Sequence, residues 1–497
     1  MIAISRLTSC CALGFLLLLA PAVRAEDAPA KPEHPTALLA MLPADSVTQH
    51  SIDVAGRKLA YTATAGTLPL RDDKGEQTAS VFYTAYTLNG AQPRDRPITF
   101  AFNGGPGAGS AYLQLGLAGP YRLDFGGGVD GAHATLVENA ETWLDFTDLV
   151  FIDPVGTGYS RALVDDKEAT KQFYSTDNDI KYLSRIVYDW LVKSGRMTSR
   201  KYLVGESYGG FRGPRITDYL QTQLGVAMNG VVLLSPYLDP AASDDENVSP
   251  LPWMLTLPSI AAAHLEREHK LTPQAMTSVI DYTRGEYATD LMRGRSDPQT
   301  ADRVVSKVTE LTGLDPLFVK RSGGRLETQA YLREVYRAEG KLGSRYDSNV
   351  TAWDPFPYAP HQETGDPILN GIIAPTTSAM VNFVTQTVGW KYEGRYNALS
   401  YDVNKLWHED DDANKGSVSQ LREAVANDPG LRVLIAHGWD DLSCPFMASV
   451  LIVDQMPAMG DPTRVQVKEY AGGHMFYARN DSQSALTADV QALYGAK

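Results

Sequence analysis

Cysteine is scarce in this chain, which has only three cysteines in 497 residues. Cys10 and Cys11 lie near the N terminus, and the third is Cys444. If the N-terminal segment is cleaved as a signal peptide, a single thiol remains and no intramolecular disulfide can form. A chain of this length can still bury a core large enough to fold without covalent cross-links.

Positive charge is also in deficit, since 45 Lys and Arg stand against 59 Asp and Glu and give a formal net charge of −14. An excess of negative charge argues against a nucleic acid as a partner. Two glycine-rich stretches, 103–107 and 153–160, have no lysine at the position that a phosphate-binding loop needs. The sequence therefore predicts neither nucleic-acid binding nor a nucleotide-binding loop.

Long apolar runs are missing except at the N terminus. There a basic residue precedes an apolar stretch at 10–20, and small residues then suit cleavage after Ala25. The stretch is too short to span a bilayer comfortably. We predict a signal peptide at 1–25, a flexible leader at 26–48, and an exported protein, periplasmic or secreted, without a membrane anchor.

The rest of the chain alternates short apolar strands with amphipathic helices, which is typical of a mostly parallel α/β sheet. The strands are predicted at 97–102, 149–152, 202–204, 230–234, 431–436 and 464–469, and the clearest helices at 179–192 and 211–224. Before them, 49–64 predicts a β-hairpin, and 80–88 is expected to pair with it antiparallel. Between about 238 and 425 the alternation gives way to helical sequence. This indicates a core at 49–237 and 426–497 with an inserted helical cap at 238–425.

The decapeptide KYLVGESYGG at 201–210 contains a G-x-S-x-G pattern between a predicted strand and a predicted helix. In an α/β-hydrolase fold this turn exposes a nucleophilic serine at the end of a strand. Ser207 is therefore a candidate nucleophile, but glycine is frequent in this chain and the pattern alone is weak. A nucleophilic serine also needs a base, and the base needs an orienting acid.

Both partners occur in the order that this fold requires, serine, then acid, then histidine. The strand at 431–436 is followed by His437 and by the adjacent acids Asp440 and Asp441, and the strand at 464–469 by Gly-Gly-His474. Position alone leaves Asp440 and Asp441 open as the acid. His437 is a rival base, but it comes too early in the order, which favours His474.

An oxyanion hole requires two backbone N–H groups aimed at the developing negative charge. Tyr208, the residue after the nucleophile, is expected to supply one. The glycine-rich loop 103–107 follows an early strand and suits the second, because glycine lets the backbone approach a substrate carbonyl closely.

With these residues in view, the chain resembles the serine carboxypeptidase family, in particular its bacterial exported members. The resemblance lies in NGGPGAGS at 103–110, WLDFTDLVFIDPVGTGYS at 143–160, GESYGG at 205–210, GWDDLSCP at 438–445 and GGHM at 472–475. It implies an α/β-hydrolase fold and selects Asp441, three residues before Cys444, as the acid. It also implies that Gly105 joins Tyr208 as an oxyanion donor, and that no metal or organic cofactor is needed.

The resemblance further implies that Asn103, Gly104 and Glu206 bind the C-terminal carboxylate of a peptide substrate. The chain departs from the eukaryotic pattern at two positions. Ala108 stands in place of a disulfide cysteine, and Leu117 stands in place of a second glutamate, so the carboxylate-binding pair is incomplete.

A deprotonated Glu206 would repel a substrate carboxylate in a low-dielectric cleft. We therefore expect peptidase activity to fall as the pH rises above about 6, while hydrolysis of substrates without a carboxylate falls less. The leading hypothesis is a serine carboxypeptidase that acts on peptides through an acyl-enzyme. The alternatives are an esterase, amidase or acyltransferase with the same triad, and a catalytically inactive binding protein, which the intact Ser207, Asp441 and His474 disfavour.

Overall fold

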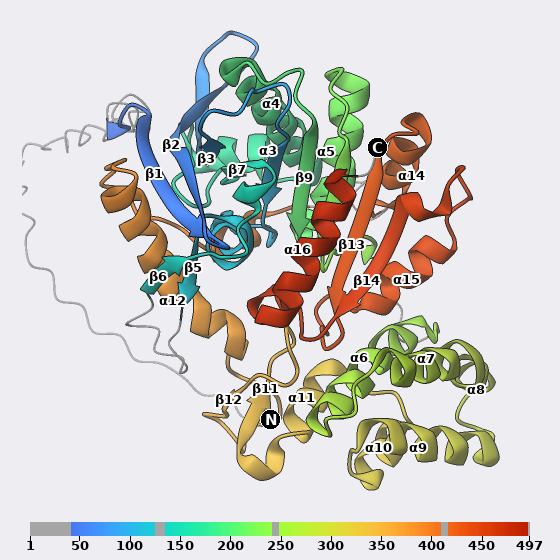
Figure 1. Cartoon of the computed structure of the whole chain (residues 1–497). Coiled ribbons are helices and arrows are strands. Elements are labelled where there is room, and N and C mark those ends of the chain that lie inside the picture. Colours follow the sequence, from blue (N-terminus) through green and yellow to red (C-terminus); the bar gives the residue numbers. More distant parts are fainter. Residues whose placement is uncertain (1–40, 125–134, 241–247, 409–415, 496–497) are drawn as a thin grey trace, which may run out of the picture.

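The computed structural model describes residues 41–124, 135–240, 248–408 and 416–495. The predicted signal peptide at 1–25 and most of the leader lie outside these residues. A ten-stranded sheet organises the chain in the order β1-β2-β3-β7-β4-β9-β10-β13-β14, with β8 paired to β3 (Figure 1). Its strands are β1 Ser46–Val54, β2 Arg57–Arg71, β3 Gln77–Leu88, β4 Ile98–Phe102, β7 Asp148–Ile152, β8 Arg161–Ala162, β9 Lys201–Glu206, β10 Gly230–Leu234, β13 Arg432–Gly438 and β14 Val465–Tyr470.

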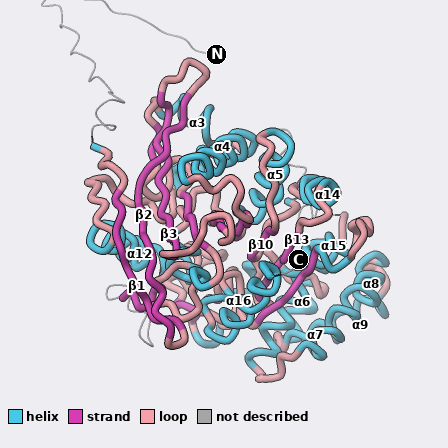
Figure 2. Tube along the Cα trace, turned by 45° about the horizontal axis from the view of Figure 1, so that its top comes forward, coloured by secondary structure: helices cyan, strands magenta, loops and turns pink. Residues whose placement is uncertain are grey.

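The six strands from β7 to β14 in this order are parallel, and β1, β2 and β3 continue the sheet antiparallel at one edge (Figure 2). The predicted hairpin forms from β1 and β2, whose turn at Ala55 and Gly56 has φ values of 50° and 75°. Positive φ at both central residues matches the twist of a tight hairpin. The mixed, mostly parallel sheet predicted from the sequence is confirmed.

Helices cover both faces of the sheet because its central strands are buried on both sides. In β10, for example, Val231 and Leu233 belong to one core and Val232 and Leu234 to the other. The first core includes side chains from α4 (Thr176–Ser194), α5 (Tyr208–Gln223) and α14 (Val418–Asn427). The second includes side chains from α12 (Pro367–Asn382) and α16 (Asn480–Gly495). The remaining helices near the sheet are α2 Ala111–Leu113, α3 Asp166–Phe173, α13 Tyr401–Leu406 and α15 Phe446–Asp454, with the short turns η1 Gln114–Ala118, η6 Phe383–Thr387 and η9 Phe476–Ala478.

A separate group of helices lies beyond the carboxyl ends of β13 and β14, at the bottom of Figure 1. It consists of α6 Leu251–Arg267, α7 Pro273–Tyr282, α8 Ala288–Arg293, α9 Pro298–Thr312, α10 Pro316–Ser322 and α11 Thr328–Glu334, followed by the hairpin β11 Lys341–Gly343 with β12 Thr351–Trp353. These helices have their own apolar core around Ile260, Val308 and Tyr331. We call the helices α6–α11, together with the β11–β12 hairpin, the cap.

The sequence predicted a longer cap, at 238–425, but the later part of that span packs on the main sheet. Trp390 contacts Phe82 of β3 with ring centroids 4.8 Å apart, and α14 lies against α5. The segment Pro367–Thr387 is long and apolar enough to cross a membrane by length and composition alone, yet Phe383 and Val384 in it are buried in the core. The domain boundaries at 238 and 425 stay predictions.

Candidate active site

The carboxyl ends of the parallel strands meet at one edge of the sheet, which is where open α/β sheets place their ligands. Asn103 follows β4, Ser207 follows β9, Asp441 comes shortly after β13, and His474 after β14. These residues are far apart in the sequence. The sheet therefore brings the loops that carry them to a common edge.

Ser207 occupies a sharp turn between β9 and α5, with φ 58° and ψ −121°. A non-glycine residue in this conformation is strained, as expected of a nucleophile elbow. The flanking glycines are required by close backbone contacts. A Cβ at Gly205 would lie 2.0 Å from the Gly209 oxygen, and a Cβ at Gly209 would lie 2.3 Å from the Phe102 oxygen. The GESYGG pattern thus reflects the tight crossing of strand, turn and helix.

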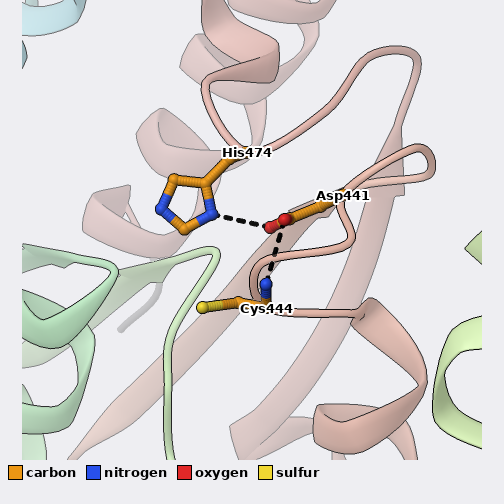
Figure 3. A group of neighbouring side chains, drawn as sticks. All are labelled: Asp441, Cys444 and His474. Atoms are coloured by element: carbon orange, nitrogen blue, oxygen red, sulfur yellow. Dashed lines mark hydrogen bonds and ion pairs between the residues drawn. The ribbon is translucent and has the colours of Figure 1, made fainter. Parts of the chain in front are cut away.

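His474 and Asp441 form a buried pair (Figure 3). His474 Nδ1 donates to Asp441 Oδ2 over 2.7 Å, while Asp441 Oδ1 accepts the N–H groups of Ser443 and Cys444 at 2.7 and 2.9 Å. Because Asp441 accepts at Nδ1, the other ring nitrogen, Nε2, is left as the basic atom. Burial alone would lower the pKa of His474, but the Asp441 carboxylate outweighs it and raises the pKa well above its usual value.

Residues 234 and 235 connect the loops of Ser207 and His474. The Leu234 carbonyl accepts the Ser207 N–H at 2.9 Å, and the next residue, Ser235, donates its hydroxyl to the His474 carbonyl at 2.8 Å. The histidine loop is also held from the cap side, where the Tyr346 carbonyl accepts the His474 N–H at 2.5 Å. A backbone network therefore sets where the two loops lie relative to each other.

His437 and Asp440, the other candidates for the base and the acid, lie in different surroundings from His474 and Asp441. His437 is fully buried, its Nε2 is 2.8 Å from the Ser449 hydroxyl, and burial lowers its pKa to about 4, so it is neutral. Asp440 points into a different cluster, with Glu266, Asp347 and Arg479. The hydrogen bond observed with His474 is made by Asp441 and not by Asp440.

The loop expected to form the oxyanion hole lies directly against the elbow. A Cβ at Gly104 would lie 2.5 Å from the Tyr208 nitrogen and 2.9 Å from Ser207 Cβ. Gly105 has φ 101°, a conformation that favours glycine. Tyr208 is the first residue of α5, so its N–H has no acceptor within that helix. Both predicted donors thus lie beside Ser207.

Glu206 and Asn103 are buried side by side, and an amide N–H of Asn103 donates to Glu206 Oε2. On the other side, the Tyr477 hydroxyl donates to Glu206 Oε1 over 2.7 Å. Burial raises the pKa of Glu206, although the nearby His474 and these two hydrogen bonds oppose the rise. Leu117, at the position of the absent second glutamate, is fully buried.

Sequence reasoning missed two tyrosines at this place. Tyr477 lies 271 positions from Glu206. Tyr112 also interacts electrostatically with Glu206, and its buried hydroxyl has no hydrogen-bond partner among the described residues. No motif signals either residue, because both contacts arise only when distant segments pack together.

A cavity of about 710 Å³ opens between this edge of the sheet and the cap. Ser207, Tyr208 and Gly105 line one side, and Trp253 of α6 and Leu332 of α11 line the other. Asn103, Gly104 and Glu206 are not among the residues that line it. The cavity is large enough for a peptide side chain next to the candidate nucleophile.

One group of described side chains offers metal-binding atoms close together. A ligand atom from each of Asp441, Cys444 and His474 lies within 4.8 Å of the others (Figure 3). Both Asp441 oxygens, however, already accept hydrogen bonds, one of them from His474. We therefore interpret this group as an acid–base pair with a neighbouring thiol, whose pKa burial raises.

Known proteins are similar to this chain in sequence and in fold. The model of the serine carboxypeptidase family matches residues 58–489. A pheromone-processing carboxypeptidase KEX1 of Coprinopsis cinerea is 28% identical over 184 residues, which cover 35% of this chain and 28% of that protein. The KEX1 of Saccharomyces cerevisiae is 33% identical over 158 residues, covering 29% of this chain and 20% of that protein. The chain thus spans less than a third of the length of these two relatives.

A plant relative and a solved structure agree with this. Serine carboxypeptidase-like 13 of Arabidopsis thaliana is 27% identical over 185 residues, covering 35% of this chain and 41% of that protein. A crystal structure of KEX1(delta)p, a prohormone-processing carboxypeptidase of Saccharomyces cerevisiae, superposes with a TM-score of 0.55 at 16% identity, covering 87% of this chain and 91% of the other. The second likeness shows a shared α/β fold.

Proposed function

The chain belongs to the serine carboxypeptidase family, and we propose that it releases C-terminal residues from peptides through an acyl-enzyme on Ser207. The observation that carries this proposal is the buried 2.7 Å bond between His474 Nδ1 and Asp441 Oδ2, at the same sheet edge as the elbow. A histidine oriented in this way has its Nε2 available as a general base.

In the proposed reaction, Ser207 Oγ attacks the carbonyl carbon of the last peptide bond and His474 Nε2 takes its proton. Asp441 holds the ring and stabilises the imidazolium. The N–H groups of Gly105 and Tyr208 donate to the oxyanion, an effect worth about 3 kcal/mol for each donor in such sites. His474 then protonates the leaving amine, and a water molecule, activated by the same histidine, releases the acyl group.

We further propose that Glu206, with Asn103 and Gly104, binds the free carboxylate of the substrate. Glu206 is next to the nucleophile and buried, and both of its oxygens accept hydrogen bonds from neighbouring side chains. When protonated, it has an O–H to donate to a carboxylate. When ionised, it places a second negative charge in a desolvated site. This specificity would favour acidic pH for peptides.

The test of the reaction is Ser207→Ala in a C-terminal release assay on a mixed peptide set, with fluorophosphonate labelling of the wild type. We expect loss of release, on the order of 10⁶-fold in kcat as for other serine nucleophiles, and labelling at Ser207 only. Ser194→Ala, on the surface of α4, is the control and should keep full activity. Release by Ser207→Ala at the control's rate would contradict the proposal.

An esterase, amidase or acyltransferase with the same triad is the second candidate, and the buried Leu117 is the observation that favours it, since it leaves one acid where the eukaryotic pattern has two. A blocked dipeptide and its C-terminally amidated form separate the candidates. A carboxypeptidase should strongly prefer the free acid. Equal rates on both would support the alternative.

We also propose export, from the pattern of residues 1–25, which lie outside the described residues. Sequencing the N terminus of the mature protein tests this. Cleavage after Ala25 is expected, and an intact N terminus in the cytoplasm would contradict it.

A further inference from the structure

Asp440, the neighbour of Asp441, belongs to a buried cluster where the cap meets the catalytic loops. Asp440 is fully buried, Glu266 reaches the cluster from α6, and Asp347 comes from the β11–β12 hairpin. Arg479, which follows η9 of the core, is the cation that faces them. It donates to both Glu266 oxygens and, over 2.7 Å, to Asp347 Oδ2, and it lies 3.8 Å from Asp440 Oδ2.

Three carboxyl groups thus face one guanidinium, and their hydrogen bonds indicate which of them carries a proton. Asn349 Nδ2 donates to Glu266 Oε2 at 2.7 Å and lies 3.5 Å from Asp440 Oδ2. Asp440 Oδ1 is buried and accepts no hydrogen bond from the described residues. A buried carboxyl oxygen without a donor is costly if it is charged. The cost is avoided if Asp440 is protonated, and the hydrogen bond between the Asp440 and Glu266 side chains then has a donor.

The electrostatics agree with one proton between these two groups. Burial, followed by the contact with Glu266, raises the pKa of Asp440 well above its usual value. Burial alone would raise the pKa of Glu266, but the hydrogen bonds from Arg479, Asp440 and Asn349 lower it to about 2. The other titratable groups that face Asp440 are Asp347 and, from α11, Tyr331. Burial raises the pKa of both.

The cluster is attached directly to the loops that carry the catalytic pair. The Asp440 N–H donates to the Gly472 carbonyl at 2.9 Å, which joins the acid loop to the histidine loop. Asp347 Oδ2 accepts the N–H of Gly473 at 3.1 Å, next to His474. A Cβ at Gly473 would lie 2.0 Å from the Tyr346 oxygen, so the cap hairpin packs closely on the histidine loop.

We propose that Asp440 is a positioning residue that shares one proton with Glu266. The resulting hydrogen bond between acid and carboxylate, together with Arg479, holds the Asp441 and His474 loops in place against the cap. Ionisation of Asp440 would place two carboxylates in contact, break this bond and loosen both loops. The inference rests on the triad chemistry proposed above but not on the carboxylate specificity. It predicts a loss of kcat at high pH on every substrate, including esters that never contact Glu206.

The test compares Asp440→Asn with wild type in pH profiles of kcat on a blocked amino-acid ester. The asparagine amide still donates to Glu266 but cannot ionise. We expect wild type to lose kcat at high pH with KM little changed, and Asp440→Asn to keep it. Asp440→Ala removes the bond at every pH and should lower kcat by about 10- to 100-fold, the effect of misplacing catalytic groups by about 1 Å. An ester assay remains valid even if the preference for free carboxylates proves wrong.

The matched control is an ion pair that joins the cap to the core at another place. Asp454 of α15 pairs with Arg284 beyond α7 over 2.6 Å, and both side chains are exposed. Asp454→Asn should leave the pH profile as in wild type, since exposed ion pairs contribute little. Infrared difference spectra, wild type minus Asp440→Asn, should contain the carbonyl band of a protonated acid at neutral pH. The proposal is overturned if that band is absent, or if both proteins lose kcat at the same high pH.

Discussion

Replacing Glu206 by glutamine removes the ionisation that we expect to control peptide hydrolysis. Glutamine keeps the size of the side chain and, as an amide, stays neutral at every pH. In the wild type, rising pH converts Glu206 to a carboxylate beside the bound carboxylate of the substrate. Burial raises the pKa of this side chain, so the conversion occurs above the usual range for a glutamic acid.

The magnitude follows from Coulomb's law. Two unit charges about 4 Å apart, at an effective dielectric constant of about 20, repel by about 4 kcal/mol. Such a repulsion lowers kcat/KM by up to about 10³-fold once Glu206 is fully ionised. His474 acts in the opposite direction. Asp441 raises its pKa, so the neutral imidazole that serves as base accumulates as the pH rises. Peptides should therefore give a bell-shaped profile in the wild type.

The assay measures kcat/KM against pH for a blocked dipeptide and for the matching ester. We expect the wild-type peptide profile to turn down at a lower pH than the ester profile. In Glu206→Gln the downturn on peptides should move up to the pH of the ester downturn, so that the two profiles run parallel. Parallel profiles in the wild type, or a peptide downturn that stays at a lower pH than the ester downturn in Glu206→Gln, would refute the reasoning.

Stability supplies an independent measure of the same ionisation. Because the folded-state pKa of Glu206 is raised, the native protein holds this proton more tightly than the unfolded chain does. The stabilisation of the native state by protonated Glu206 is therefore fully present at low pH. It is lost as the pH rises from the pKa of Glu206 in the unfolded chain through its pKa in the folded protein. The free energy of unfolding of Glu206→Gln should therefore improve relative to wild type over that range, and urea titrations at several pH values would measure it.

Three further outcomes are expected. Tyr477→Phe removes one donor to Glu206, so the downturn of the peptide profile should move to higher pH while ester hydrolysis is unchanged; an unmoved downturn would count against this contact. Gly104→Ala places a Cβ 2.5 Å from the Tyr208 nitrogen and should lower kcat on peptides and esters alike, with labelling of the nucleophile as the readout. Asp179→Asn leaves the buried Arg212 guanidinium without its partner charge and should cost about 3–5 kcal/mol of unfolding free energy; a loss below about 1 kcal/mol in chemical denaturation would contradict this.

The sequence determined the order and kind of the main strands because their short apolar runs can be buried only inside a two-sided sheet. The boundaries of helices and strands predicted from the sequence were less accurate where tertiary contacts override local preference. The helix after Ser207 was predicted from 211, but α5 begins at Tyr208 and includes Gly209 and Gly210. Glycine disfavours a helix. Here it is required, since a Cβ at Gly210 would lie 2.4 Å from Pro236 Cβ.

For the site, the sequence by itself supplied candidates in chain order, because topology makes Ser207, Asp441 and His474 follow successive parallel strands. Pattern alone left Asp440 and Asp441 equivalent, and only the fold distinguishes their surroundings: one carboxylate pairs with His474, while the other is buried against Glu266 of the cap. The physical reason is that the order of the strands determines which loops meet at the edge of the sheet. The direction and the pKa of a side chain on such a loop depend instead on the residues that pack against it. Those neighbours come from other elements of the chain, Glu266 from α6 of the cap and His474 from the loop after β14.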